Sequence, residues 1–370
     1  MSARDEGVAP KVFFTPERFA EEQASRMDPP RGNLLIAGCR SGSALSGEVT
    51  QRYERLLREA GSDSAVPHLR DIDHRFSDSE TIVRLEEHVG GADVYLFQCL
   101  FDPTCDPCTD HDYMAFLIAC RAFREHGARH VTGVLPYLAY ARQDKPTKFR
   151  REPTTAKLMA DLALAAGIDR LIVWDPHCEQ IRGFYGNMPV NALESLTLFI
   201  DVFSRFRNRD DVIAVAPDAG RSKYVTYFGR AMGLTCAIAA KYRPKPEEVV
   251  ISEVIGEFPG KRIAIVLDDM ISGAGTIDAL VRKLVKEKGI EEVYVGASHN
   301  LCVGHARERL EALYVDFGLR EVVVTDSIPQ TEEFRALPFV SVESLADILA
   351  RTINRIHFNR SVSQVFYKPQ

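Results

Sequence analysis

Apolar and polar positions alternate in blocks along the chain. Short runs rich in Val, Ile and Leu predict strands, and longer stretches with apolar residues three or four positions apart predict helices. The expected strands are 33–37, 93–98, 130–135, 170–174, 212–216, 235–239, 263–267, 292–297 and 321–325. The expected helices are 113–125, 155–166, 222–233, 277–288 and 304–314. Regular alternation of strand and helix predicts an α/β fold with mostly parallel sheets covered by helices on both faces.

The number of strands predicts two domains, because so many strands would overfill one modest sheet. A chain of 370 residues is long enough for two similar doubly wound α/β halves. We expect an N-terminal extension over residues 1–31 and an N-terminal α/β domain over 32–194. A C-terminal α/β domain over 195–345 and a tail over 346–370 complete the expected organisation.

Composition narrows the class of protein. The net charge of −6 argues against a general nucleic-acid surface. No run of 18 apolar residues occurs, so no membrane span is expected, and residues 1–31 are too polar for a signal peptide. The eight cysteines are scattered, several of them inside apolar runs, which is typical of reduced thiols rather than of a disulfide framework. We therefore expect a cytoplasmic globular protein.

The stretch VLDDMISGAGTID, at Val266–Asp278, combines two kinds of polar chemistry. An expected strand ends at Asp268 and Asp269, a loop of small residues follows at Ser272–Thr276, and a helical pattern begins at Ile277. Such a loop before a helix N-terminus predicts a phosphate cradle, whereas the two carboxylates suit sugar hydroxyls or Mg²⁺. Together they predict a sugar phosphate site. An ordinary strand–helix turn with solvated carboxylates is an equally weighted alternative for this stretch alone.

Polar side chains also follow four other expected strands. They are His177, Asp218, Lys241 with Arg243, and Arg142 with Gln143. Each has a plain alternative, such as a satisfied loop histidine or a solvated charge cluster. Ligands of open α/β sheets bind at the carboxyl ends of the strands, so the combination favours a site for phosphates and a nucleotide.

Eight motifs in a fixed order then carry a family resemblance. They are RFSDSE (75–80), YARQDK (140–145), DPHCEQIRGFY (175–185), APDAG (216–220), KYRPKP (241–246), LDDMISGAGT (267–276), VVVTDSIP (322–329) and SVSQVF (361–366). In this order they resemble the ribose-phosphate pyrophosphokinase (phosphoribosyl pyrophosphate synthetase) family, from residue 33 to residue 366. The resemblance implies two phosphoribosyltransferase-like domains. It also implies transfer of the β,γ-pyrophosphoryl group of Mg-ATP to the anomeric hydroxyl of ribose 5-phosphate, which gives phosphoribosyl pyrophosphate and AMP.

The resemblance also implies roles for individual residues. The implied catalytic residues are Lys241, Arg243 and His177, and the implied ATP-binding residues are Phe76, Asp78, Glu80, Arg142 and Gln143. The implied ribose 5-phosphate site comprises Arg243, Asp268, Asp269, Ser272, Gly273, Ala274, Gly275 and Thr276. His177 and Asp218 match the positions associated with Mg²⁺, the implied cofactor. A homo-oligomer built from dimers, up to a hexamer, is implied as well.

Several positions depart from the family pattern. Ser272 replaces a usual carboxylate, Gly273 a usual hydroxyl donor, and Arg221 a usual glycine. These changes keep two alternatives open. One is a non-catalytic regulatory subunit of a synthetase, and the other is a pyrophosphokinase for a different sugar phosphate. A simple phosphoribosyltransferase is less favoured, because it would not need a second α/β half carrying Arg142 and Gln143.

An unusual insertion spans residues 101–113 and contains Cys105 and Cys108 with His111 and Asp112 nearby. A CxxC pair with a histidine could bind zinc or take part in redox chemistry. No second ligand pair at standard spacing accompanies it, so we expect a plain surface loop.

Overall fold

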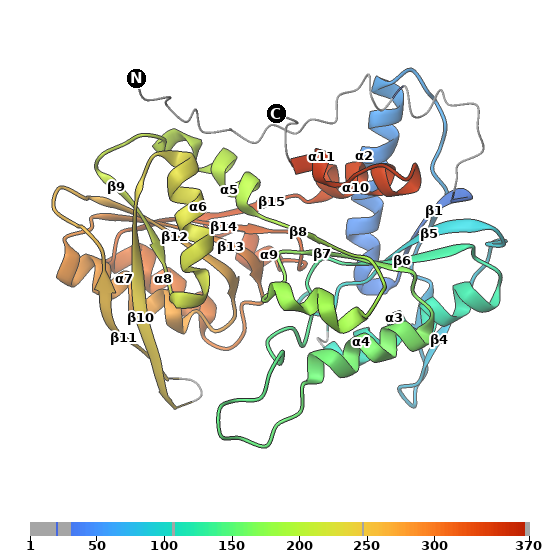
Figure 1. The fold of residues 1–370 in the computed structure, drawn as a ribbon, viewed down its shortest axis with the longest axis horizontal. Helices are drawn as coiled ribbons and strands as arrows, with labels where there is room; N and C mark the ends of the chain where they lie inside the picture. The colour runs from blue at the N-terminus through green and yellow to red at the C-terminus, as the bar shows by residue number, and fades with distance from the viewer. Residues whose placement is uncertain (1–19, 21–30, 106–107, 246–247, 367–370) are drawn as a thin grey trace. The chain divides into compact units, whose positions relative to one another are not determined.

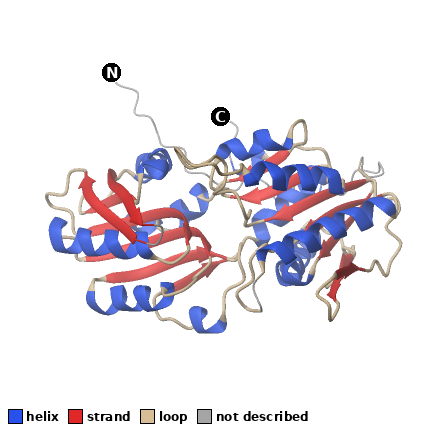
Figure 2. Cartoon of the chain, turned by 90° about the horizontal axis from the view of Figure 1, so that it is seen from below, coloured by secondary structure: helices blue, strands red, loops and turns tan. Residues whose placement is uncertain are grey.

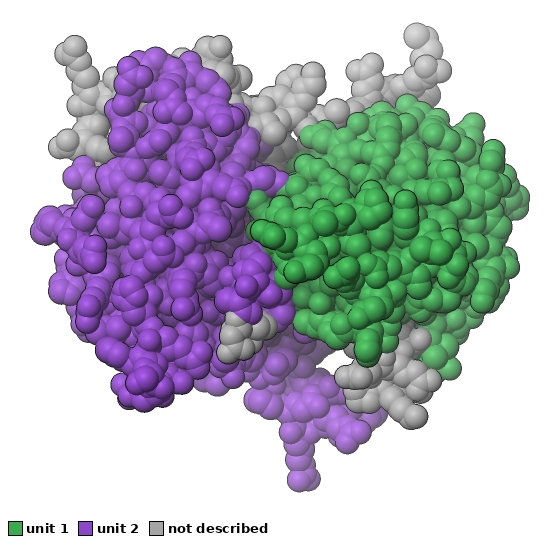
Figure 3. Space-filling view, turned by 180° about the vertical axis from the view of Figure 1, so that it is seen from behind, with its two compact units in different colours: residues 1–10, 194–326, 330–343 green, residues 11–193, 327–329, 344–370 purple. Residues whose placement is uncertain are grey.

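The computed structural model describes residue 20 and residues 31–105, 108–245 and 248–366. The chain divides into two compact units, coloured separately in Figure 3. Within the described residues, unit 1 comprises Glu194–Asp326 and Gln330–Glu343. Unit 2 comprises the described residues up to 193, then 327–329 and 344–366. Each unit is an α/β layer structure (Figures 1 and 2), so the predicted fold class is confirmed.

Unit 2 contains a parallel sheet of six strands in the order β2-β1-β5-β6-β7-β8. Its strands are β1 (Asn33–Gly38), β2 (His68–Leu69), β5 (Ala92–Phe97), β6 (His130–Leu135), β7 (Arg170–Trp174) and β8 (Val190–Leu193). A separate antiparallel hairpin is formed by β3 (Asp73–Arg75) and β4 (Thr81–Val83). The order reverses between β1 and β5, as expected of a doubly wound sheet.

Helices cover both faces of the sheet in unit 2 (Figure 1). One face carries α2 (Ser43–Glu59) and α10 (Ala346–His357), and the other carries α3 (Thr109–Glu125) and α4 (Thr155–Ala166). The shorter helices are η1 (Arg40–Gly42), η2 (Glu179–Tyr185) and α11 (Ser363–Phe366). The segment 346–370, expected as a tail, thus contributes a buried helix to this unit, where Tyr53 Oη donates a 2.7 Å hydrogen bond to Asn354 Oδ1.

A buried ionic cluster holds α10 against β5. Asp93 is fully buried and accepts hydrogen bonds from Arg31 Nε at 3.1 and 3.2 Å and from Tyr95 Oη at 3.2 Å. Its Oδ2 is also 2.8 Å from His357 Nδ1, on the last residue of α10. Arg31 closes the expected extension 1–31, and the rest of that extension apart from residue 20 lies outside the described residues. The cluster therefore connects Arg31 and the C-terminal end of α10 to β5 of the sheet in unit 2.

Unit 1 contains a sheet of seven strands in the order β11-β10-β9-β12-β13-β14-β15, with only the β10–β11 pair antiparallel. The strands are β9 (Val212–Ala216), β10 (Thr235–Lys245), β11 (Glu248–Ile255), β12 (Ile263–Ile271), β13 (Glu292–Asn300), β14 (Leu319–Thr325) and β15 (Val340–Glu343). The helices are α5 (Leu196–Val202), η3 (Ser204–Phe206), η4 (Ala219–Arg221), α6 (Ser222–Met232), α7 (Gly275–Lys288), α8 (Ala306–Asp316) and α9 (Glu332–Arg335).

The sheet of unit 1 separates two apolar cores, because successive strand residues point to opposite faces. Ile265 and Leu267 pack with Phe203 of the α5–η3 turn and with residues of α6. Val266 points the other way and packs with Leu280 of α7 and with residues of α8. All nine expected strands and all five expected helices are present; the bounds of 130–135, 155–166, 170–174 and 212–216 are unchanged, and those of the others shift.

The expected end of the strand 263–267 is wrong. β12 continues to Ile271, so Asp268 and Asp269 lie inside the strand rather than at its end. The longer strand is possible because β13 is longer than expected too, and it pairs with β12 as far as Asn300 beside Ile271. The loop of small residues still follows directly after the strand.

The expected end of the strand 235–239, with Lys241 and Arg243 beyond it, is also wrong. Residues 240–245 continue β10 and pair with β11, an edge strand that no pattern in the sequence predicted. Pro244 has no N–H to donate, and the pairing register shifts between Tyr242 and Lys245, which leaves the proline out of the ladder. Residues 246 and 247 lie outside the described residues.

The insertion 101–113 is also not entirely a loop. α3 begins at Thr109, so the last five residues of the insertion form the first turns of that helix. In the part of the chain that the structure describes, no helix combines the length and the apolar content needed to cross a bilayer.

Candidate active site

The candidate phosphate loop connects β12 to α7 in unit 1. Residues 272–274 form a bend, and α7 begins at Gly275 rather than at Ile277, which places Thr276 in its first turn. Ala274 has a φ of 56°, in the left-handed region that favours glycine, and its side chain makes no capping hydrogen bond. The first N–H groups of an α-helix have no partner within the helix, and its N-terminal end carries a partial positive charge. This end of α7 is therefore suited to an anion.

Asp268 and Asp269 form a buried acidic pair just before this loop. They are 8% and 5% exposed, and Asp269 N donates a 2.9 Å hydrogen bond to Asp268 Oδ1. Burial, followed by repulsion from Asp269, raises the pKa of Asp268 well above its ordinary value, while the charge of Arg221 acts in the opposite direction. The pair presents carboxylate oxygens that accept hydrogen bonds from ligand hydroxyls.

Asp218 and Lys241 form an ion pair in the same unit. Lys241 Nζ lies 2.7 Å from Asp218 Oδ2, and the two side chains are 17% and 32% exposed. Asp218 Oδ1 accepts hydrogen bonds from Gly220 N at 3.0 Å and Arg221 N at 3.3 Å, which caps η4. The predicted catalytic cation is thus held by the carboxylate predicted to act with Mg²⁺.

These groups meet at the carboxyl edge of one sheet. β9 pairs in parallel with β12, with Val215 beside Val266, so Asp218, just after β9, and Asp268, near the end of β12, lie at the same edge of the sheet. The turn η4 contacts both β10 and β12, and the charge of Asp218 reaches Asp268. The structure therefore brings these predicted residues of unit 1 to one edge of its sheet. Arg243 lies on β10, but its side chain is outside the described part of the structure.

In unit 2, the predicted ATP-binding residues Phe76, Asp78 and Glu80 occupy the turn between β3 and β4. Phe76 N donates to Glu80 O at 2.8 Å, and Glu80 N donates to Asp78 Oδ1 at 3.1 Å, so the turn is closed by its own hydrogen bonds. The phenyl ring of Phe76 is 48% exposed although it is large and apolar. An exposed aromatic ring beside two carboxylates is suited to stacking on a base.

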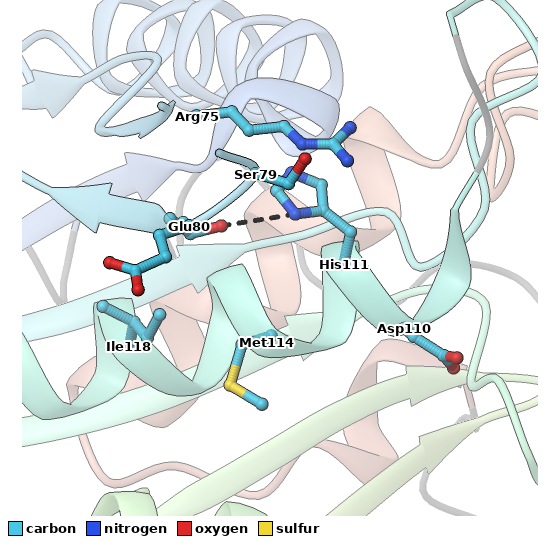
Figure 4. A pocket seen from close by; sticks show the side chains of 8 residues that line it. Arg75, Ser79, Glu80, Asp110, His111, Met114 and Ile118 are labelled. Carbon is cyan, nitrogen blue, oxygen red and sulfur yellow. Dashed lines mark hydrogen bonds between the residues drawn. The ribbon is translucent and has the colours of Figure 1, made fainter. Parts of the chain in front are cut away.

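A pocket of about 540 Å³ lies beside this turn (Figure 4). It is lined by Arg75, Ser79, Glu80, Thr81, Asp110, His111, Met114 and Ile118, from the hairpin and from α3. His111 Nδ1 is 3.2 Å from Thr81 Oγ1, and Tyr140 Oη donates to Asp110. The first turn of α3 therefore connects the hairpin to the loop after β6, where Arg142 and Gln143 lie.

Arg142, Gln143 and His177 follow the neighbouring strands β6 and β7. Gln143 N donates to Tyr140 O at 2.8 Å and closes a turn that leaves Arg142 exposed. His177 is exposed as well, and Cys178 Sγ lies 3.9 Å from Ala141 O, so the two loops touch. Unit 2 thus brings these three predicted residues to one end of its sheet.

Each unit carries its own candidate donor for Mg²⁺, and each donor fits the ion as one ligand of a shell completed by others. Asp218 offers a partly exposed carboxylate whose oxygens keep further lone pairs, and His177 offers an exposed imidazole. Among the described residues, no group of three or more His, Cys, Asp or Glu side chains could hold a metal ion. Mg²⁺ in phosphate-transfer sites commonly takes one or two carboxylates together with water and substrate phosphates. These donors suit an ion that arrives with ATP.

The CxxC pair in the insertion has no metal-site character in the described residues. Cys105 is exposed, its Sγ lies 3.6 Å from Asp102 O, and residues 106 and 107 lie outside the described residues. Partial burial and the charge of Asp102 raise the pKa of Cys105 to about 11, so the thiol is protonated at neutral pH. A protonated thiol is a poor nucleophile.

The sequence analysis missed one residue beside the phosphate loop. Arg309, on α8, donates a hydrogen bond from Nη1 to Gly273 O. A single arginine on an amphipathic helix gives no signal in the sequence, because such residues are usually solvated. Only the packing of α8 beside the loop shows the contact.

Comparisons with known proteins cover most of the chain. Residues 35–167 match the model described as the N-terminal domain of ribose phosphate pyrophosphokinase. Residues 215–367 match the model described as the phosphoribosyl synthetase-associated domain. The chain is similar to the ribose-phosphate pyrophosphokinase of Clostridium acetobutylicum, with 40% identity over 79% of this chain and 88% of that protein. It is 38% identical to that of Synechococcus elongatus, over 91% of this chain and 95% of that protein.

A solved structure agrees with these sequence relatives. The crystal structure of phosphoribosylpyrophosphate synthetase from Mycobacterium smegmatis superposes with a TM-score of 0.74 at 30% identity. The superposition covers 88% of this chain and 99% of that chain. With two family models matched and relatives of nearly full length, this chain belongs to the ribose-phosphate pyrophosphokinase family.

Proposed function

We propose that this chain transfers the β,γ-pyrophosphoryl group of Mg-ATP to the anomeric hydroxyl of ribose 5-phosphate, giving phosphoribosyl pyrophosphate and AMP. Family membership supports the activity. The observation that carries the proposal is the shared edge of unit 1. There the ion pair Lys241–Asp218, the buried pair Asp268–Asp269 and the N-terminus of α7 lie on or just after neighbouring strands of one sheet.

In this proposal the sugar phosphate binds to unit 1. Its phosphate occupies the loop Ser272–Thr276, where backbone N–H groups and the hydroxyls of Ser272 and Thr276 donate hydrogen bonds. The carboxylates of Asp268 and Asp269 accept hydrogen bonds from the ribose hydroxyls. The substituted loop keeps the features that a phosphate needs, because backbone amides and a helix terminus do not depend on side chains. This supports a phosphorylated sugar as the acceptor.

The chemical step needs charge stabilisation more than covalent catalysis. The anomeric oxygen forms a bond to the β-phosphorus of ATP, and the bond from that phosphorus to the α,β-bridging oxygen breaks. The bridging oxygen leaves with its electron pair on AMP, and the hydroxyl proton is released. Lys241 and Arg243 donate hydrogen bonds to the charge that develops on the bridging and transferring oxygens. Asp218 and His177 would each supply a donor to Mg²⁺, and the chemistry that the ion supplies when bound is neutralisation of charge on the ATP phosphates.

The ion pair of Lys241 has a role before the reaction as well. Asp218 Oδ2 lies 2.7 Å from Lys241 Nζ, so the ion pair orients the lysine side chain within the site before the substrates bind. Polyphosphate carries more negative charge than one carboxylate, so binding of Mg-ATP favours exchange of this partner. The same carboxylate is then free to approach the metal ion.

We further propose that ATP binds through Phe76, Asp78, Glu80, Arg142 and Gln143, with the ring of Phe76 stacking on the base. Such an exposed turn is also suited to completing the site of a neighbouring subunit, as expected for a homo-oligomer in the cytoplasm. The regulatory-subunit alternative predicts a folded protein that binds ligands without turnover.

The test is an end-point reaction of the purified chain with ATP, Mg²⁺ and ribose 5-phosphate, in which AMP and phosphoribosyl pyrophosphate are separated and quantified. Equal amounts of the two products are expected. Folded protein that forms no AMP, with or without added inorganic phosphate, would contradict the proposal and favour a regulatory subunit. AMP formed only with another sugar phosphate would instead identify a different acceptor.

A further inference from the structure

The candidate phosphate loop is held from one side by a single segment of the chain. Three successive carbonyls, those of residues 271–273, accept hydrogen bonds from residues 301–309. Ile271 O accepts from Leu301 N at 2.8 Å and from Cys302 N at 3.4 Å, and Ser272 O accepts from Val303 N at 3.1 Å. The third carbonyl, Gly273 O, accepts from Arg309 Nη1. Arg309 lies on α8, which packs beside α7 on one face of the sheet (Figure 1).

These bonds fix the direction of the loop amides. A trans peptide is planar, with its C=O and N–H pointing opposite ways. The N–H groups of residues 272, 273 and 274 therefore point away from the 301–309 segment. Among the described residues, none of these three amides has a hydrogen-bond acceptor. Successive N–H groups turned to one side form a concavity that binds anions.

Arg309 contacts the loop next to its residue with an unfavourable backbone conformation, Ala274. Ala274 takes a left-handed φ of 56°, which is unfavourable for a residue with a Cβ. Such conformations persist where the surrounding contacts over-determine them. Arg309 holds the peptide directly before Ala274. The donors to the carbonyls of residues 271 and 272 are backbone amides, whereas the donor to Gly273 O is the side chain of Arg309. Loss of this contact would free the Gly273–Ala274 peptide to rotate.

We propose that Arg309 is a positioning residue for the sugar phosphate. By holding Gly273 O, it keeps the amides of the loop directed at the phosphate before the ligand arrives. Arg309 does not itself need to touch the substrate. The inference rests on the proposed function, in which this loop binds the phosphate of ribose 5-phosphate.

The proposal separates binding from chemistry. Ribose 5-phosphate should bind roughly tenfold or more weakly when Arg309 is replaced by methionine, because a hydrogen bond from a charged donor is lost and the loop amides disperse. The turnover number at saturating ribose 5-phosphate should change little, since Lys241 and Asp218 are untouched. Replacement by lysine keeps a charged donor and should recover part of the lost affinity.

The matched control is Arg307→Gln. Arg307 lies on the same helix two residues earlier, and its Nε pairs with Glu311 Oε1 at 3.1 Å on the surface rather than with the loop. This variant should bind ribose 5-phosphate as the wild type does. A merely structural role for Arg309 predicts lower thermal stability without a selective change in sugar-phosphate affinity.

The experiment measures ribose 5-phosphate binding by titration calorimetry, and KM and kcat by AMP formation, for the wild type, R309M, R309K and R307Q. Weaker binding and a higher KM in R309M, with kcat within about threefold and partial recovery in R309K, would support the proposal. Unchanged binding in folded R309M would overturn it. A wild type that binds ribose 5-phosphate but forms no AMP would refute the proposed function alone, because the binding comparison still decides the role of Arg309.

Discussion

The ion pair of Lys241 and Asp218 allows catalysis and stability to be separated in one variant. Lys241→Ala removes the ammonium 2.7 Å from Asp218 Oδ2. Two unit charges at that distance attract by roughly 1.5 kcal/mol in bulk water, before the costs of ordering and partly desolvating the side chains. Partly exposed pairs accordingly contribute about 0.2–1 kcal/mol to stability. For a unit of this size, that corresponds to a loss of at most about 4 °C in Tm.

The expected catalytic loss is much larger. A donor aimed at charge that develops in the transition state is worth about 10²–10³ in kcat. Lys241→Ala should therefore reduce kcat at least a hundredfold, while the loss of binding to ribose 5-phosphate stays small. The loss of stability stays small compared with the loss of kcat, because Asp218 keeps its hydrogen bonds from Gly220 N and Arg221 N after the lysine is removed.

The assay follows AMP formation at saturating substrates, with Tm measured by differential scanning fluorimetry on the same preparations. Lys261→Ala is the control, because that half-buried lysine in the same unit donates to Asp210 O and should show wild-type turnover. The reasoning is refuted if kcat of Lys241→Ala falls less than tenfold, or if Tm falls as steeply as activity.

Three further outcomes are expected. Burial, with the charges of Asp102 and Asp73 adding to it, raises the pKa of Asp112 to about 7. Between pH 4 and 7 the folded state therefore binds more protons than the unfolded state, and the free energy of unfolding falls as the pH rises. Asp112→Asn should remove this pH dependence, a slope of at most about 1.4 kcal/mol per pH unit in urea unfolding. His357→Ala should cost roughly 2–3 kcal/mol of unfolding free energy in the same assay, because buried Asp93 loses one of its partners; an unchanged midpoint would contradict this. Replacing either aspartate at positions 268 and 269 by asparagine should raise KM for ribose 5-phosphate about tenfold or more in AMP-formation kinetics, with ATP affinity unchanged.

The local patterns of this sequence were sufficient for the architecture. Runs such as 130–135 and 170–174 are apolar enough to be buried on both faces, and the structure keeps their ends unchanged. The sequence also predicted that polar side chains would follow the strands, because the carboxyl ends of parallel strands lie at one edge. Asp218 and Asp268 meet at such an edge in unit 1.

Features that depend on a distant partner strand were not predictable. β12 extends through Asp268 and Asp269 because β13 pairs with it as far as Asn300. β10 extends through Lys241 because β11, an edge strand, folds back against it. A window of sequence contains one strand of a pair only, so it carries no information on where the ladder of hydrogen bonds ends.

The amino-acid sequence by itself predicted the strand–helix alternation and the candidate phosphate loop, since these depend on neighbouring residues and on backbone preferences, whereas the chemistry followed from the family resemblance. Only the tertiary structure decided which groups hold the site in place. Lys241 is oriented by a carboxylate 23 positions earlier, and Gly273 by an arginine 36 positions later. The physical reason is that hydrogen bonds act over about 3 Å in space, whatever the separation along the chain.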